Sequence, residues 1–191
     1  MIEAALEVFV ENGYPGTRMA DIAERAGVAV QTLYFTFHTK PELLEACYAH
    51  AVLGGPDGVA PMDTPELQEA LTSRSGRGAL RAFVRGNTAI VSRAAAIDSV
   101  AAAATHEPEV ARVRGHSEAL RREGMSALVS SLEERFGLAR GVDTATDLLM
   151  MLAGGATYLS LTEYGWSLDE YAEWLGDVLA TQLLARPGRA R

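Results

Sequence analysis

A stretch without acidic residues, Gly27 to Pro41, combines amide, hydroxyl and aromatic side chains. Helical periodicity predicts a short helix from about Val30 to Phe35, and a glutamine or threonine there can bond a base edge or contact a thymine methyl group. The candidate base-contacting residues on its outward face are Val30, Gln31, Thr32, Phe35 and Thr36. The candidate phosphate-contacting residues beside that face are Tyr34, His38 and Lys40. These side-chain types indicate a surface that can enter the major groove of a DNA duplex.

A tight turn between two short helices would position this surface. Ala23 is small where the first helix must approach the second, and Gly27 can adopt the positive φ that the turn requires. Ile22, Val28 and Leu33 are expected to fill the wedge between the two helices. This spacing predicts a helix-turn-helix, whose second helix inserts into the major groove. An ordinary helical hairpin would explain the apolar spacing, but not the acid-free polar and aromatic face.

The start of the first of these helices is a further candidate for phosphate contact. Thr17 is expected to cap a helix from Arg18 to Ala26. The backbone N–H groups and the dipole at a helix N-terminus favour an anion. Thr17 and Arg18 therefore join the candidate DNA-contacting residues.

Helical periodicity covers most of the chain, and no stretch shows sustained alternation. We expect an all-α fold of about nine helices, a three-helix helix-turn-helix domain followed by an antiparallel helical bundle. The Gly- and Pro-rich segment 54–65 predicts a boundary between two domains, 1–50 and 51–191. One long helix is expected over about 144–164.

The composition provides enough apolar material for a core, because 48% of the 191 residues are hydrophobic. The single cysteine, Cys47, excludes an intramolecular disulfide, and its place on an apolar helix face favours a small buried hydrophobe over a redox switch. The His and Glu residues around Pro108 indicate a helix start, so we expect no metal ion and no cofactor. Since no apolar stretch approaches the roughly 20 residues of a membrane helix, and no basic leader is present, we expect a cytoplasmic protein without a membrane partner.

The charge balance argues against a simple nucleic-acid binder. The formal net charge is −8, and residues 1–50 hold seven acidic and three basic residues. Most of these acids fall on predicted helices other than the one that would enter the groove. Local sign matters most within a Debye length of about 8 Å. We therefore expect a DNA affinity that is modest and falls strongly with salt.

The segment over about residues 2–50 resembles the N-terminal domain of the TetR family of bacterial transcriptional regulators. The residues that carry the resemblance are Phe9, Gly13, Tyr14, Thr17, Asp21, Ile22, Ala23, Ala26, Gly27, Val28, Leu33, Tyr34, Phe37, Lys40, Leu43 and Leu44. The resemblance implies a homodimeric repressor that binds an inverted repeat in double-stranded DNA and is released by a small apolar effector. It also implies that Val30 to Thr32, Tyr34 and Phe35 contact bases, and that Thr17 and Lys40 contact phosphates. Members usually carry a basic segment before the first helix, which here begins at Met1.

The resemblance places an effector site and a dimer interface in the C-terminal part. The candidate effector-contacting residues are Phe83, Asn87, Met125, Met151 and Tyr158. The candidate dimer-interface residues form two apolar stripes, Leu148, Leu152 and Leu159 followed by Tyr171, Leu175, Leu179 and Leu183. Packing within one chain is the alternative for both sets, because Met and aromatic stripes at helical spacing also form cores. Asn87, if buried, needs a polar partner, which an effector can supply.

Two rival function classes stay open. A dimeric small-molecule-binding or protein-interaction module that does not bind DNA is favoured by the acidic N-terminal segment. An enzyme is disfavoured because no nucleophile–base pair, paired carboxylates or Gly-rich phosphate loop occurs at a useful spacing.

Overall fold

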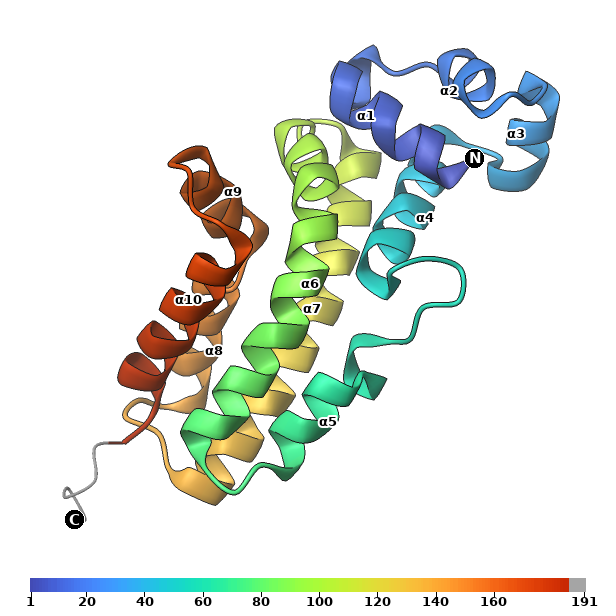
Figure 1. Cartoon of the computed structure of the whole chain (residues 1–191). Helices are drawn as coiled ribbons and strands as arrows, with labels where there is room; N and C mark the ends of the chain where they lie inside the picture. The colour runs from blue at the N-terminus through green and yellow to red at the C-terminus, as the bar shows by residue number, and fades with distance from the viewer. Residues whose placement is uncertain (186–191) are drawn as a thin grey trace. The chain divides into compact units, whose positions relative to one another are not determined.

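The computed structural model describes residues 1–185, which are mostly helical (Figure 1). The helices of the N-terminal part are α1 (Ile2–Gly16), α2 (Met19–Ala26), α3 (Val30–Phe37) and α4 (Lys40–Leu53). They are followed by a 3-10 turn η1 (Pro61–Asp63), α5 (Pro65–Thr72), α6 (Gly76–Ala103), α7 (Pro108–Phe136), α8 (Val142–Leu152), α9 (Gly155–Glu163) and α10 (Leu168–Leu183). Within residues 1–185 no strand forms, and an isolated antiparallel bridge joins Leu138 to Leu184. The predicted all-α fold is confirmed.

Gly13 divides α1 into a long first segment and a short second one. Its φ of 67° and ψ of 169° lie outside the helical region, a conformation that glycine adopts without a Cβ penalty. Pro15 lies in the short second segment, and Thr17 ends the element in an extended conformation. The chain direction therefore changes before α2 begins.

The helix predicted over about 144–164 is in fact two helices. α8 ends at Ala153, with φ −91° and ψ 18°, and Gly154 is the extended N-cap of α9. A Cβ on Gly154 would lie 2.9 Å from the carbonyl oxygen of Met150, so the backbone approaches too closely here for a side chain. The single-helix prediction was wrong because the apolar period continues across this break. None of the helices in residues 1–185 combines the length and the apolar character needed to cross a membrane.

The described chain forms two compact units. The first contains residues 1–58 and 93–118, and the second contains residues 59–92 and 119–185. Because α6 and α7 contribute residues to both units, this division differs from the contiguous domains 1–50 and 51–191 that the sequence predicted. The division into a DNA-binding part and an effector-binding part stays a prediction.

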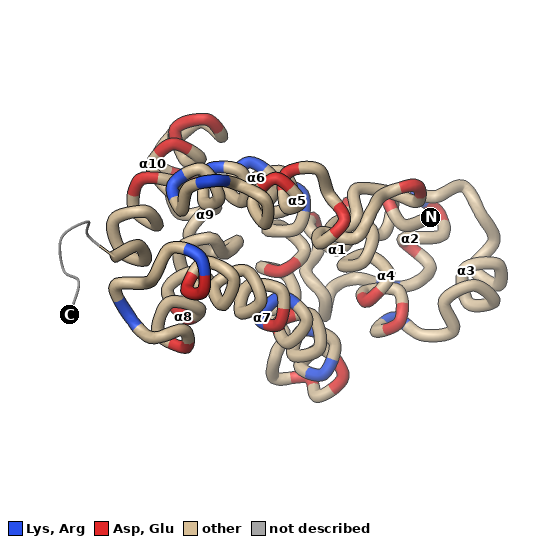
Figure 2. The backbone as a smooth tube through the Cα atoms, turned by 90° about the horizontal axis from the view of Figure 1, so that it is seen from below, with Lys and Arg blue, Asp and Glu red and all other residues tan. Residues whose placement is uncertain are grey.

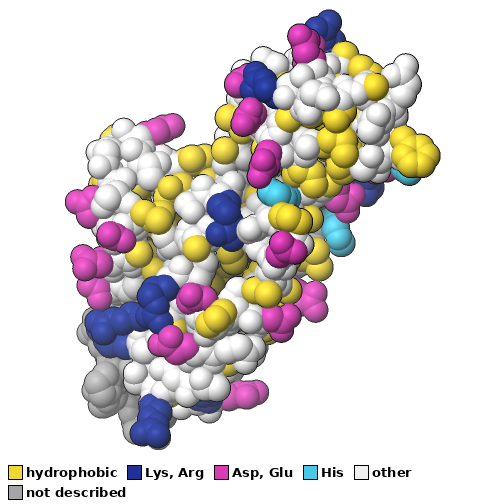
Figure 3. All heavy atoms as spheres, turned by 45° about the vertical axis from the view of Figure 1, so that its right-hand side comes forward, with side chains coloured by type: hydrophobic (Ala, Val, Ile, Leu, Met, Phe, Trp, Pro, Cys, Tyr) yellow, Lys and Arg dark blue, Asp and Glu magenta, His cyan; other side chains and the backbone are white. Residues whose placement is uncertain are grey.

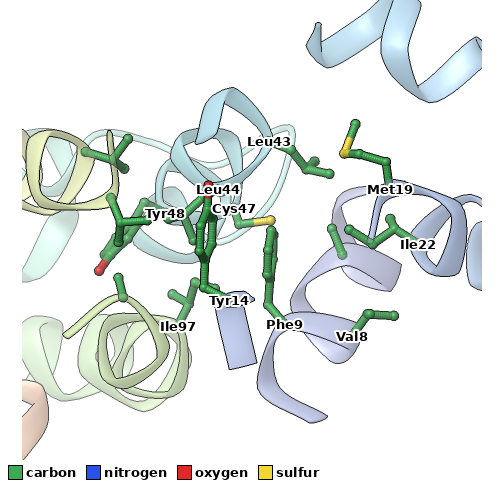
Figure 4. Packing of buried hydrophobic residues seen from close by; sticks show 14 of the residues in the cluster. Val8, Phe9, Tyr14, Met19, Ile22, Leu43, Leu44, Cys47, Tyr48 and Ile97 are labelled. Atoms are coloured by element: carbon green, nitrogen blue, oxygen red, sulfur yellow. The ribbon is translucent and has the colours of Figure 1, made fainter. Parts of the chain in front are cut away.

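The first unit has an apolar core contributed by α1 to α4 with parts of α6 and α7 (Figure 4). Phe9 and Tyr14 stack with their ring centroids 5.8 Å apart. Ile22 of α2, Leu33 of α3 and Leu44 of α4 are fully buried in the same core. Burial of each such side chain contributes about 1.5–3 kcal/mol. Leu33 thereby fixes α3 on the unit, with Val30 and Phe37 half-buried at its two ends, while the residues between them other than Leu33 face solvent.

The second unit has its own core, formed by α5, parts of α6 and α7, and α8 to α10. Phe83 and Met125 bring α6 and α7 into this core, and Leu149 brings α8. Tyr171 of α10 is fully buried and meets Tyr158 of α9 edge to face, with ring centroids 5.4 Å apart. α10 is therefore an integral part of the unit and not an appended element.

Candidate nucleic-acid interface

A helix-turn-helix positions the candidate surface. Gly27 caps α2 in the left-handed region, with φ 67° and ψ 30°, and its N–H donates to the carbonyl oxygens of Ala23 and Glu24. The Val28 N–H also donates to the Ala23 carbonyl oxygen, at 3.0 Å. Nothing would lie within 4 Å of a Cβ at Gly27, so the backbone φ, and not space, requires glycine. The predicted turn is confirmed, with Ala23 fully buried under it.

The outward face of α3 is exposed, aromatic and uncharged. Phe35 is 85% exposed and Tyr34 is 47% exposed, values that are high for aromatic side chains. The hydroxyl and amide residues of this face, all exposed, are Gln31, Thr32 and Thr36. Figure 2 shows α3 without any Lys, Arg, Asp or Glu along its tube. Val30 differs from the others, because it is half-buried and packs against the core.

Thr17 does not fit its predicted role. Its side chain is 2% exposed, and its hydroxyl donates to the carbonyl oxygens of Gly13 at 2.7 Å and Val8 at 3.2 Å. The N-cap of α2 is Arg18, one residue later, and Thr17 instead ends α1. Since the hydroxyl is already bonded and shielded from solvent, we correct the prediction and leave the Thr17 side chain out of the phosphate-contacting set.

Arg18 and Asp21 form a capping arrangement at the start of α2. The guanidinium donates to both Asp21 carboxylate oxygens, at 3.0 and 2.6 Å, and the Arg18 backbone N–H donates to the same group at 3.2 Å. The guanidinium lowers the pKa of the Asp21 carboxyl through these hydrogen bonds. The Arg18 side chain remains 80% exposed, so a phosphate would have to compete with Asp21 for it.

The Lys40 side chain binds groups within the first unit. Its Nζ donates to the carbonyl oxygens of Tyr14 at 2.9 Å and Thr17 at 3.1 Å, and it lies 4.1 Å from the Tyr14 ring centroid. Burial lowers the pKa of the Lys40 ammonium, and the charge of Glu107 opposes that shift. Sequence reasoning missed this role, because the two carbonyl groups come together only after Gly13 redirects the chain.

The remaining basic residue of α1 to α4 is also paired. Arg25 of α2 donates to Glu7 at 2.9 Å and to Glu11 at 2.7 Å, both on α1. Figure 3 likewise shows basic side chains lying against acidic ones at the surface. Arg18, Arg25 and Lys40 therefore all have partners within the first unit, which accounts for every basic residue of the segment 1–50. The surface offers phosphates few uncommitted cations.

His38 ends α3 in an unusual conformation. It is the non-glycine residue with positive φ in the described chain, at φ 50° and ψ −49°, and its N–H donates to the Tyr34 carbonyl oxygen at 2.9 Å. Such a conformation costs a non-glycine residue about 1–3 kcal/mol. The exposed imidazole follows the α3 surface directly.

The comparisons with known proteins agree with this geometry. The sequence model described as bacterial regulatory proteins of the tetR family matches residues 1–47. The N-terminal domain belongs to the TetR family. A match of 31% identity over 116 residues to the uncharacterized HTH-type transcriptional regulator YezE of Bacillus subtilis covers 59% of this chain and 57% of that protein. The fatty acid metabolism regulator protein of the same species is 46% identical over 44 residues, 23% of each chain. The match thus spans 57% of the first of these relatives and 23% of the second.

Solved structures of transcriptional regulators share the fold over nearly the whole chain. A regulator from Rhodococcus sp. has a TM-score of 0.72 and 16% identity, covering 94% of both chains. A regulator from Saccharomonospora viridis, solved in complex with choline, has a TM-score of 0.72 and 18% identity, covering 97% of this chain and 96% of that one. PfmR from Thermus thermophilus has a TM-score of 0.70 and 20% identity, covering 97% of this chain and 98% of that one. At these identities the likeness establishes the fold alone.

Four of the five effector candidates are buried or half-buried in the second unit. Phe83, Asn87 and Met125 are buried, and Tyr158 is half-buried beside Tyr171. Met151 is 60% exposed, so its predicted place in an internal site is wrong. It lies on the solvent side of α8, which the apolar period does not reveal.

Asn87 has a partner inside the protein. Its Nδ2 donates to the carbonyl oxygen of Ala153 at 3.1 Å, a group left free where α8 ends. The neighbouring Thr88, which sequence reasoning missed, is 4% exposed, and its hydroxyl has no hydrogen-bond partner among the described residues. A buried hydroxyl without a partner is uncommon in native proteins. A threonine in a helical apolar segment gives no sequence signal for this.

The predicted dimer-interface stripe on α10 requires a correction. Its four members are fully buried inside the second unit: Tyr171, Leu175, Leu179 and Leu183. A side chain without exposed surface cannot form an interface, so the alternative, packing within one chain, holds for α10. The other three candidates, on α8 and α9, are half-buried and keep some exposed surface: Leu148, Leu152 and Leu159.

Proposed function

We propose that the chain is a DNA-binding transcriptional regulator that inserts α3 into the major groove. The observation that carries this proposal is the exposed, uncharged face of α3, on which Tyr34 and Phe35 stand in solvent. Exposed aromatic side chains on a rigid helix mark an interaction surface. The match of residues 1–47 to the TetR regulatory proteins supports duplex DNA as the partner.

DNA binding is tested with the purified chain and the intergenic duplex upstream of its own gene. Fluorescence anisotropy at low salt should show saturable binding that an unrelated duplex does not match. Tyr34→Ala should weaken binding at least tenfold, a loss of about 1.4 kcal/mol. Tyr164→Ala is the matched control, because Tyr164 is 82% exposed on the other unit and lies outside the proposed surface. Equal binding by wild type and Tyr34→Ala would refute the assignment of α3.

The proposed regulator is a homodimeric repressor acting on an inverted repeat. Successive major grooves on one side of a duplex lie about 34–36 Å apart, so two α3 helices related by a two-fold axis would read the two half-sites. Dimerisation through the exposed parts of α8 and α9, including Leu148 and Leu159, would supply that axis. Light scattering in line with size exclusion should give twice the 20.4 kDa chain mass. A monomer at micromolar concentration would contradict this part of the proposal.

The second unit is proposed to bind a small, largely apolar effector. The unpartnered Thr88 hydroxyl beside Asn87 supports this, since a ligand oxygen or nitrogen would satisfy it. By linkage, an effector that weakens DNA binding must itself bind more weakly to the DNA complex. Displacement of the labelled duplex by a small-molecule panel that includes choline tests the idea. Thr88→Val should abolish the response to an active compound while DNA binding stays intact.

The rival function is a small-molecule-binding or interaction module without DNA activity. The internal pairing of Arg18, Arg25 and Lys40 is the observation that favours it. Absence of duplex binding even at about 50 mM salt, where electrostatic contacts are strong, would select this rival.

A further inference from the structure

We infer that α3 reads A·T base pairs, and that Phe35 recognises the methyl group of thymine. This inference rests on the proposed DNA-binding function and names the sequence class that the same surface selects. The carrying observation is the combination, on one exposed face, of an amide, an unpaired aromatic ring and two threonines, without any charged group.

The hydrogen-bonding groups of α3 suit adenine better than guanine or cytosine. Direct recognition of guanine uses mainly Arg or Lys, and recognition of cytosine uses Asp or Glu, none of which occurs in α3. The basic groups nearest along the chain are also committed, because Lys40 bonds two carbonyl oxygens and Arg18 bonds Asp21. Gln31 carries both a donor and an acceptor, which matches the N6 and N7 groups of adenine.

The apolar groups of the same face suit thymine. Phe35 exposes 85% of its surface, and the thymine C5-methyl is the distinctive apolar group in the major groove. The Thr36 hydroxyl donates to the Thr32 carbonyl oxygen at 3.0 Å, so it already has a hydrogen-bond partner within the helix. The methyl group of Thr36 is then the part of the side chain that can contact thymine. Contact of Phe35 with a methyl group would remove apolar surface of both partners from water.

The spacing of these residues along α3 places them side by side on one surface. Gln31 and Phe35 are four residues apart, as are Thr32 and Thr36, and residues at this spacing are neighbours on a helix surface. The amide and the ring therefore form one row and the two threonines an adjacent row. Such a surface would meet consecutive base pairs, with adenine on one strand bonded by Gln31 and thymine methyl groups packed on Phe35.

The experiment begins with selection from a library of random-sequence duplexes by the purified chain, followed by sequencing. The expected result is a half-site whose centre is made of A·T pairs. Uracil is then substituted for thymine at each central position, which removes only the C5-methyl group. At one or two positions, affinity should fall about threefold to fivefold, as expected for one methyl group removed from the contact.

Variants assign the effect to a residue. Phe35→Ala should bind more weakly and should no longer distinguish thymine from uracil, whereas Phe35→Leu should keep part of the difference. Thr36→Ser keeps the hydroxyl bond to Thr32 and removes the methyl group, so it tests the adjacent row. Because both positions are exposed, thermal unfolding should remain close to that of the wild type, which separates recognition from folding.

Each outcome of the selection decides between the two levels of the proposal. A selected half-site centred on G·C pairs would overturn the A·T inference, and equal binding to thymine and uracil duplexes would overturn recognition of the methyl group. Both results would leave DNA binding standing. A uracil effect of the same size in wild type and Phe35→Ala would overturn the role of Phe35. Failure to enrich any duplex would reject the proposed function itself.

Discussion

The ammonium group of Lys40 lies 4.1 Å from the ring centroid of Tyr14 and donates a hydrogen bond of 2.9 Å to the carbonyl oxygen of the same residue. A second hydrogen bond from Lys40 reaches the Thr17 carbonyl oxygen at 3.1 Å. Lys40 begins α4, whereas Tyr14 and Thr17 belong to the segment that follows the Gly13 break. One cation thus ties the two helices that flank the helix-turn-helix.

Replacement of Lys40 should therefore lower the free energy of unfolding, and this loss should be its main effect. Lys40→Met removes the two hydrogen bonds and the cation–π contact, and should cost about 1–3 kcal/mol. Urea unfolding followed by circular dichroism measures this loss. Lys40→Arg, which can still donate, should recover part of it. If Lys40→Met is as stable as the wild type but fails to bind DNA, the phosphate-contacting role predicted from the sequence is right and the structural role is wrong.

The salt dependence of DNA binding should be shallow. The logarithm of the binding constant falls with the logarithm of salt concentration by about 0.9 for each phosphate neutralised. Since the three basic residues of segment 1–50 are already paired, few counterions would be released, in contrast to the strong dependence that the sequence suggested. Anisotropy titrations between about 50 and 200 mM salt give the slope.

A charge variant sharpens this prediction. Glu7→Gln with Glu11→Gln frees Arg25 and removes two negative charges from each chain. The salt slope should become steeper by about one unit per freed arginine that reaches a phosphate. Glu3→Gln, on the same helix, is the control for a charge change alone. A steep slope in the wild type would show that Arg18 or Arg25 exchanges its partner for DNA.

Stability should decrease in alkaline solution. Burial raises the pKa of the Cys47 thiol to about 12, and burial, with the charges of Glu107 and Glu109, raises the pKa of Tyr14 to about 12. Between the unfolded pKa values of about 8.5 and 10 and the folded value near 12, the unfolded chain binds fewer protons than the folded one. Raising the pH through this window therefore favours unfolding, and the full stability is present below it.

Melting temperatures measured from pH 8 to pH 11 test this sign. Cys47→Ala should show a smaller decrease with pH than the wild type, because it lacks the thiol contribution. The native thiol should also fail to react with Ellman's reagent at pH 8, and one thiol per chain should appear after denaturation. Rapid reaction of the native protein would contradict the buried position of Cys47.

The hydrogen bond of Asn87 should contribute measurably to the stability of the second unit. Asn87→Ala leaves the Ala153 carbonyl oxygen without its side-chain donor in a buried setting, which should cost about 1–3 kcal/mol. Gln68→Ala is the matched control, because Gln68 donates to the Met62 carbonyl oxygen at an exposed position and should lose little. Urea unfolding of both variants compares the two amides. Equal losses of unfolding free energy in the two variants would contradict the view that burial makes the Asn87 hydrogen bond the more important one.

The helical parts of the fold could be predicted from the sequence because local rules decide them. Gly27 caps α2 with a positive φ, and the hydroxyl groups of Thr39 and Ser167 each accept from the backbone N–H three positions on, which begins α4 and α10. The break at Gly154 was not predicted, because the apolar period of α8 continues across it into α9.

The roles of individual side chains were harder to predict than the elements that carry them. Periodicity shows that Tyr171 and Leu175 share a face, but it does not show whether that face meets the same chain or another. For Thr17 and Lys40, the sequence predicted contacts with phosphates, whereas the structure gives both side chains backbone carbonyl oxygens as partners. The exposed α3 face was predicted with most of its residues because exposure on a short helix follows from the single buried Leu33.

The positive-φ conformation of His38 marks the end of α3. α3 stops there after eight residues, which at 1.5 Å per residue gives about 12 Å. Stacked base pairs are spaced by about 3.4 Å, so one such helix spans about three or four of them. Four base-pair positions allow about 256 different DNA sequences, whereas a genome offers about 10⁶–10⁹ competing sites. A single α3 helix of this length would contact too few base pairs to select one site in a genome. The proposed regulator would therefore also depend on the spacing between the two half-sites that its two α3 helices contact.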